Sequence, residues 1–149
     1  MNRKPRNPKD AIVNRRVMKS VIIRAIFICI SAFGAFLFGY FIANVPEGVD
    51  RHILAISMCF FTLVASELLV VYPSRSDVFM GMSSRLFSNK FLNLATLAAL
   101  AVLVAVMYIP VLGDLFTVIP LGATEMTICI LLVITAIAGF EISKLNSRR

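Results

Sequence analysis

Long apolar stretches constrain this chain more than any other feature of its sequence. A helix needs about 20 apolar residues to cross a hydrocarbon core of about 30 Å. Four stretches meet that length, at residues 21–43, 53–72, 91–111 and 122–142. They use most of the 149 residues, so no room remains for a soluble catalytic domain. The sequence therefore predicts an all-α polytopic membrane protein, a single four-transmembrane-helix bundle over residues 1–149.

The placement of the basic residues predicts how these helices are oriented. Of the 15 Lys and Arg, eight lie in residues 1–24, three between the second and third spans, and three after the fourth. The two remaining connections hold only Arg51. Cytoplasmic loops carry such an excess of positive charge. We therefore expect a basic cytoplasmic segment at residues 1–20, both termini in the cytoplasm, and insertion into the lipid bilayer of the plasma membrane. Topology explains the charge, so no nucleic-acid partner is expected.

An acidic residue inside the second span is the main candidate for function. The stretch "TLVASELLVVYPSRSD" places Glu67 five residues before Tyr72, the expected cytoplasmic end of that span. A charge at the centre of a bilayer costs about 2.5–3.5 kcal/mol on insertion scales, and less near the ends. One interpretation is an ion pair with Arg24, which lies in the first turns of the first span on the same side. The other is a ligand for a cation or a proton.

The neighbours of Glu67 limit the second interpretation. Its helix face is apolar and consists of Phe60, Leu63, Val64 and Val71, while Thr62 and Ser66 point elsewhere. A hard cation such as calcium takes six or more oxygen ligands. If Glu67 binds an ion, most of the ligands must come from outside this sequence. The sequence also has no Ser/His/Asp or Cys/His arrangement, no phosphate loop and no metal cluster. We expect no catalysis by this chain alone, and no cofactor in it.

Small residues recur within two of the spans. Ser31, Ala35, Gly39 and Ala43 follow one another at four-residue intervals in the first. The third span carries a second group: Ala95, Ala98, Ala99, Ala101 and Ala105. Small side chains at helical spacing let two backbones approach closely in a membrane. Both groups are interpreted as contact faces for helices of this chain or of another.

Ordered motifs run through the whole chain. They are "RKPRNPKDAIVNRRVMKSVIIRAI", "MCFFTLVASELLVVYPSRSD", "RLFSNKFLNLATLAALAVLVAVMYIPVLGDLFTVIPLGATEM" and "FEISKL". In this order they resemble the carboxy-terminal membrane region of type II P-type cation-transporting ATPases, from the segment after the sixth helix to the end of the tenth. The most specific part is "LFSNK…YIPVL…F…PL". The resemblance implies the last four helices of such a pump.

The resemblance has consequences for Glu67 and for partners. In calcium pumps of this family the eighth helix gives a glutamate to the ion site, and Glu67 occupies the matching position. A role as ligand for calcium or another cation is thereby implied. The family's phosphorylated aspartate lies in a D-K-T-G-T motif, and no Asp-Lys occurs in this sequence. The chain is therefore expected to be a support region that cannot couple ATP to transport alone. Its partner would be the remaining portion of a P-type ATPase, on the same or a separate chain.

Two other hypotheses stay open. The chain could be a stand-alone membrane protein that acts as an orphan interaction partner, binding other helices through its small-residue faces. It could also be a small homodimeric transporter that uses Glu67. Such transporters cluster polar and aromatic groups around the carboxylate, which the face of Glu67 lacks.

Overall fold

A computed structural model describes residues 15–45, 47–74 and 89–146 of the chain. All regular secondary structure in this part of the chain is helical. The helices are α1 (Arg15–Phe41), α2 (Arg51–Leu69), α3 (Val71–Ser74), α4 (Lys90–Tyr108), α5 (Pro110–Phe116) and α6 (Ala123–Asn146).

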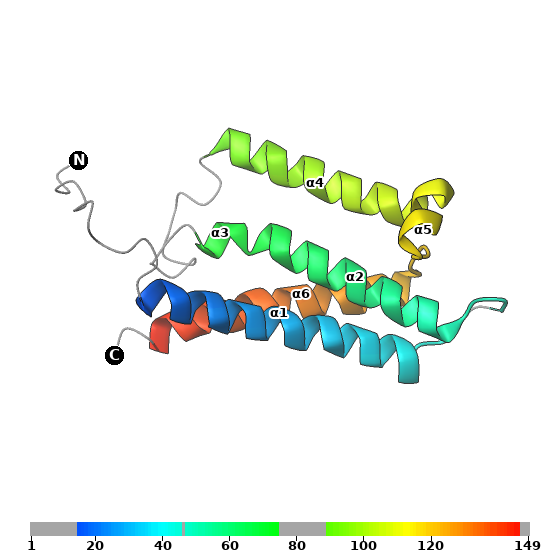
Figure 1. Ribbon diagram of the computed structural model, residues 1–149, viewed down its shortest axis with the longest axis horizontal. Helices are drawn as coiled ribbons and strands as arrows, with labels where there is room; N and C mark the ends of the chain where they lie inside the picture. Colours follow the sequence, from blue (N-terminus) through cyan, green and yellow to red (C-terminus); the bar gives the residue numbers. More distant parts are fainter. Residues whose placement is uncertain (1–14, 46, 75–88, 147–149) are drawn as a thin grey trace.

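Four segments of these helices are long and apolar enough to cross a membrane: Met18–Phe41, Arg51–Ser74, Lys90–Tyr108 and Ala123–Ser143. The second joins α2 and α3, because Val70 keeps a helical backbone between them. The four-helix, all-α prediction is thus confirmed. Successive spans run in opposite directions, so the start of α1, the short α3, the start of α4 and the end of α6 lie at one end of the bundle (Figure 1). This end is called the α3 end below.

Local side chains fix where two of the spans begin. The carboxylate of Asp50 accepts a hydrogen bond from the backbone N–H of His52 at 2.8 Å, at the start of α2. The side-chain oxygen of Asn89 accepts one from the N–H of Leu92 at 3.1 Å, at the start of α4. Each bond satisfies a backbone donor that has no partner within its helix. Pro110 opens α5, where the missing N–H costs nothing.

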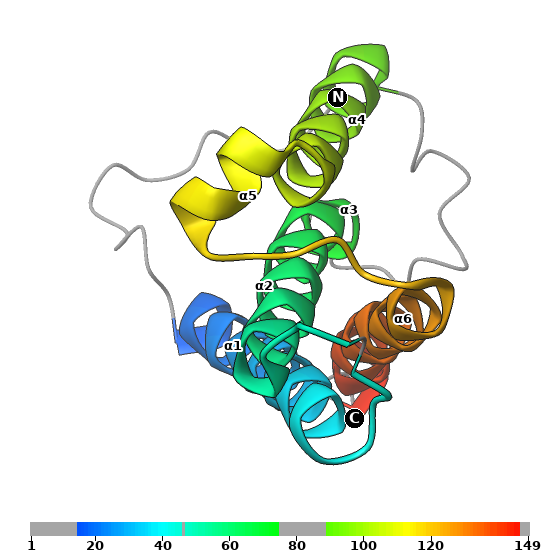
Figure 2. The same ribbon diagram turned by 90° about the vertical axis from the view of Figure 1, so that its right-hand side faces the viewer.

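The core lies where α2 packs against α1 and α6. Helix α2 has half of its span buried, more than any other candidate span. Met58 of α2 and Cys129 of α6 are fully buried there. Helix α4 lies on the other side of α2 and packs against α2 and α5 (Figure 2). The bundle is therefore a group of three helices with α4 attached at its side, and α2 is the span that the other three spans all contact.

Candidate functional site

The candidate ion ligand Glu67 lies on α2 and is exposed. Ser74, the last residue of the span, is the seventh residue after Glu67. At a rise of about 1.5 Å per residue, the Cα of Glu67 lies about 10 Å from the end of the span. Measured against a hydrocarbon core of about 30 Å, this is about a third of the way into the membrane. That depth is greater than the sequence predicted, because the helical span extends two residues beyond Tyr72.

The residues one turn before and one turn after Glu67 are also exposed. Leu63 has 43% of its surface exposed and Val71 has 37%. Residues four apart share a helix face, so Leu63, Glu67 and Val71 form a continuous strip, called the Glu67 strip below. No described helix covers this strip. A carboxylate within an apolar strip of a membrane span is costly unless a partner outside the described residues neutralises or ligates it.

The polar side chains of α2 lie on its buried face, as expected for Thr62 and Ser66. Both are fully buried, as is Ser57 two turns nearer the start of the helix. The hydroxyl of Ser57 donates to the carbonyl of Ile53 at 2.7 Å and accepts a hydrogen bond from the N–H of Ile119 at 2.9 Å. The hydroxyl of Ser57 therefore ties α2 to the segment after α5, whereas the buried hydroxyls of Thr62 and Ser66 have no hydrogen-bond partner among the described residues. All three lie on the buried face of α2, away from the exposed Glu67.

The structure places the guanidinium of Arg24 against Ser74. Its Nη1 donates to the hydroxyl of Ser74 at 3.3 Å, and that hydroxyl in turn donates to the carbonyl of Val70 at 2.7 Å. Within the described residues Arg24 makes no ion pair with Glu67. The structure thus joins α1 to α3 at the α3 end, and it does not bring together the two residues that the sequence offered as a pair.

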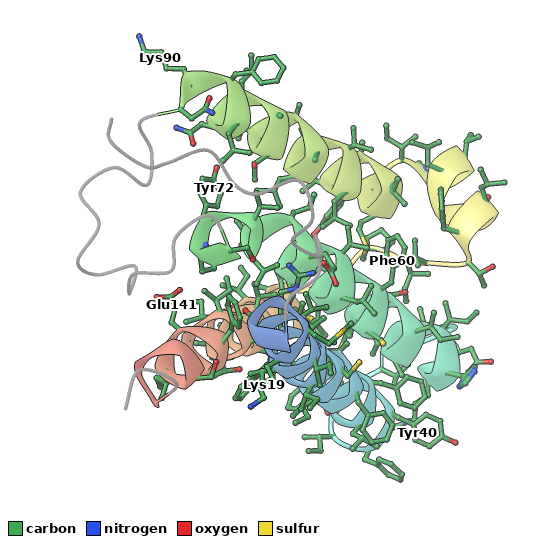
Figure 3. The ribbon with its side chains drawn as sticks, turned by 60° about the vertical axis from the view of Figure 1, so that its left-hand side comes forward. Lys19, Tyr40, Phe60, Tyr72, Lys90 and Glu141 are labelled. Carbon is green, nitrogen blue, oxygen red and sulfur yellow. The ribbon has the colours of Figure 1, made fainter. Side chains whose placement is uncertain are left out.

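A second polar contact at the same end joins α3 to α4. The hydroxyl of Tyr72 donates to the side-chain oxygen of Asn93 at 3.2 Å. Tyr72 projects from α3 toward the start of α4 (Figure 3). Sequence reasoning identified Tyr72 only as the expected end of the second span. The pairing with Asn93 could not be found from sequence, because it depends on which helix packs beside α3.

Glu141 is a buried carboxylate that the sequence did not single out as a candidate. It is 4% exposed and lies in the last turns of α6, next to the buried Phe140 (Figure 3). Lys144, three residues further along α6, lies outside the residues whose side chains the structure describes. Glu141 therefore belongs to the packed α3 end of the bundle, while Glu67 belongs to an uncovered strip.

The small residues of the first span lie in the interior. All four are buried: Ser31, Ala35, Gly39 and Ala43. A Cβ placed on Gly39 would lie 2.8 Å from the Cα of Ala55, so α1 and α2 meet backbone to backbone at this point. Nearer the start of α1, a Cβ on Gly139 of α6 would overlap the ring of Phe27. Sequence reasoning did not single out Gly139, because its contact partner is the ring of Phe27 and not another small residue.

The alanines of α4 have a different placement. Ala95, Ala98 and Ala101 are exposed, while Ala99 and Ala105 are half-buried. Among the described elements α4 has its main contacts with α2 and α5 only. The alanine face is therefore largely unused within this chain, which agrees with the alternative of a partner on another chain or segment.

The described residues do not complete a cation site. They contain no group of three or more His, Cys, Asp or Glu side chains that could hold a metal ion. Glu67 is a single carboxylate, whereas calcium takes six to eight oxygen ligands. The arrangement can supply one oxygen-donor side chain, on a rigid helix, to a site that other helices would have to complete.

Comparison with known proteins gives a family and two relatives. The model of the family described as "Cation transporting ATPase, C-terminus" matches residues 1–146. A calcium-transporting ATPase of Bacillus subtilis (strain 168) is 31% identical over 116 residues, which are 78% of this chain and 12% of that protein. A calcium-transporting ATPase of Listeria monocytogenes is 29% identical over 145 residues, which are 97% of this chain and 16% of that protein. The chain thus spans less than a fifth of the length of these relatives.

Proposed function

We propose a function from the premise that this chain belongs to the family of cation-transporting ATPase carboxy termini: it is the last membrane region of an ATP-driven calcium pump. In this role it supports the helices that carry the transport pathway and contributes at most one ion ligand. The remaining portion of the ATPase, on the same or a separate chain, supplies the nucleotide site and the other ligands. The pump would reside in the plasma membrane, with both ends of this region in the cytoplasm.

The observation that carries the proposal is the exposure of Glu67 on the Glu67 strip. Leu63, Glu67 and Val71 are all exposed although α1, α4 and α6 pack against α2, so the strip is available to helices that are not part of the described bundle. A charged side chain in a membrane span faces a protein interior or an aqueous cavity and has a partner. Helices that carry further oxygen ligands would cover the strip and share a cation with Glu67.

The choice of calcium rests on chemistry and on the relatives. A carboxylate is a ligand that calcium prefers, and the flexible coordination of calcium accepts side chains from several elements. Both relatives are calcium-transporting ATPases. The Arg24 side chain does not compete for Glu67, because it is engaged by Ser74. The Glu67 side chain is therefore available to a cation.

The test is equilibrium binding of radioactive calcium to the complete pump with Glu67→Gln. Glutamine keeps the size of the side chain but removes the charge, so the affinity for calcium should fall by about tenfold or more, which corresponds to about 1.4 kcal/mol. Glu47→Gln is the matched control, since Glu47 is an exposed carboxylate in the connection before α2. Unchanged calcium binding in the Glu67 variant would remove the ligand role, even though the family assignment would stand.

A further inference from the structure

The connection between α4 and α6 presents an unusually exposed apolar pair. Val111 and Leu115, four residues apart on α5, have 77% and 75% of their surfaces exposed. Residues at this spacing lie on one face of a helix. They are more exposed than Leu94 and Leu97, the leucines on the outward side of α4, at 66% and 65%. A face of this kind needs an apolar environment that the described residues do not supply.

The opposite side of α5 is held against the bundle. Leu112 is half-buried and packs on the core, and Gly113 is buried with no room for a side chain, since a Cβ there would lie 2.9 Å from the carbonyl oxygen of Val118. Thr117 ends α5 in the left-handed conformation, with φ of 54°. The helix therefore cannot rotate Val111 and Leu115 inward without losing these contacts.

The chain after α5 is held by two further hydrogen bonds. The N–H of Ile119 donates to the hydroxyl of Ser57 at 2.9 Å, which ties the connection to α2. The hydroxyl of Tyr108 donates to the carbonyl of Leu121 at 3.1 Å, which ties it to the end of α4. Both bonds use side chains of membrane spans, so the connection is fixed relative to the spans. These contacts therefore fix the orientation of the exposed face of α5 relative to the spans.

The position of α5 identifies what the face meets. The helix begins two residues after the span of α4 ends at Tyr108, at the end of the bundle opposite to the α3 end (Figure 1). It extends sideways from α4, across the direction of the spans (Figure 2). Val104 and Tyr108, in the adjoining last turns of α4, are exposed as well. A tyrosine at the end of a span is typical of the headgroup zone.

We propose that α5 is an interfacial helix, which inserts Val111 and Leu115 into the lipid of the outer leaflet at the boundary of headgroups and acyl chains. A short helix lying in the plane of the interface buries its apolar face to a depth of about 5–10 Å. The neighbouring Asp114 is exposed and remains on the aqueous side. The helix thereby anchors the outer end of the bundle, independently of whether the chain belongs to a working pump.

The absence of tryptophan from the sequence permits a direct experiment. The chain is prepared with the single substitution Leu115→Trp and reconstituted into phosphatidylcholine vesicles whose acyl chains carry bromine at known depths. We expect blue-shifted emission and the strongest quenching by bromine near the headgroup end of the chains. Leu97→Trp, in the middle of α4, should be quenched most by bromine near the bilayer centre. Asp114→Trp should show red-shifted emission and little quenching by either lipid.

Other outcomes of the same experiment overturn the proposal. If the fluorescence of Leu115→Trp is quenched by acrylamide but not by brominated lipid, the exposed face of α5 lies in water. Emission that is blue-shifted and escapes both quenchers would place it against protein, either a second copy or another subunit. Val111→Trp repeats the measurement at the other exposed residue of the pair, and since neither side chain is packed, both variants should fold like the unmodified chain.

Discussion

A Cβ atom on Gly39 of α1 would lie 2.8 Å from the Cα of Ala55 of α2, so these two helices meet with no space for a side chain. A contact this close gives the two backbones extensive van der Waals packing. Such packing drives helix association in a membrane, where there is no hydrophobic driving force between helices. The contact lies in the half of the bundle remote from the α3 end. It fixes the distance between the helix that starts the region and the helix that carries Glu67.

The first prediction concerns this contact. Gly39→Ala should destabilise the bundle by about 1–3 kcal/mol, because the added methyl group forces the helices apart. Denaturation in mixed micelles with increasing dodecyl sulfate measures the effect. Gly34→Ala is the control on the same helix, since its Cβ would meet only the side chain of Leu132 at 3.8 Å. Equal losses for both variants would show that the close contact does not hold the helices together.

The second prediction concerns the connection between α2 and the segment after α5. Ser57→Ala should cost about 1–3 kcal/mol, because the part-buried N–H of Ile119 loses its acceptor. The amide of Ile119 should also exchange its hydrogen faster, which mass spectrometry or NMR detects. Thr135→Ala removes an exposed hydroxyl that bonds only to its own helix, at the carbonyl of Leu132, and should change neither quantity. Unaltered exchange in the Ser57 variant would contradict the assigned bond.

The third prediction separates the two interpretations of Glu67. If Arg24 is engaged by Ser74, the stability effects of Arg24→Met and Glu67→Gln should add within about 0.5 kcal/mol in a double-mutant cycle. A pair of Arg24→Met with Ser74→Ala should instead show a measurable coupling. Coupling of more than about 1 kcal/mol between Arg24 and Glu67 would mean that the two form an ion pair in the membrane.

The fourth prediction concerns orientation. A cysteine introduced at Lys90, at the α3 end of the bundle, should be labelled by an impermeant maleimide only after the membrane is opened. A cysteine introduced at Glu47, in the connection at the other end, should be labelled in intact cells. The unmodified chain measures the background, because its three cysteines all lie within candidate spans. The reverse pattern would place both ends of this region outside the cytoplasm.

The sequence predicted the spans well and their partners poorly, for a physical reason. Twenty apolar residues are required by the thickness of the membrane, and this requirement does not depend on other helices. The alanines of α4 illustrate the limit: their spacing indicates a face suited to close packing, but Ala95, Ala98 and Ala101 are exposed in this chain. A face of small residues indicates that another helix can pack closely against it. It does not indicate whether that helix belongs to this chain or to another.

The candidate site was predicted to a similar extent. Helix periodicity places Glu67 in an apolar strip. The same periodicity shows that no other polar residue lies on that helix face. The engagement of Arg24 by Ser74 and the bond between Ser57 and Ile119 do not follow, because each depends on how two distant elements pack. The role of Glu67 as a cation ligand stays a prediction, since the described residues do not complete a cation site.

The most direct test of the central claim is phosphorylation of the native polypeptide. An antibody against the tail "SKLNSRR" would recover it from host membranes in mild detergent, and the recovered material would be incubated with labelled ATP with and without calcium. We predict a calcium-dependent acyl phosphate, cleaved by hydroxylamine, on a polypeptide much larger than 16.5 kDa or on one that is recovered together with a 16.5 kDa chain. Recovery of a 16.5 kDa polypeptide with no calcium-dependent phosphorylation would contradict the account and leave a free four-helix membrane protein.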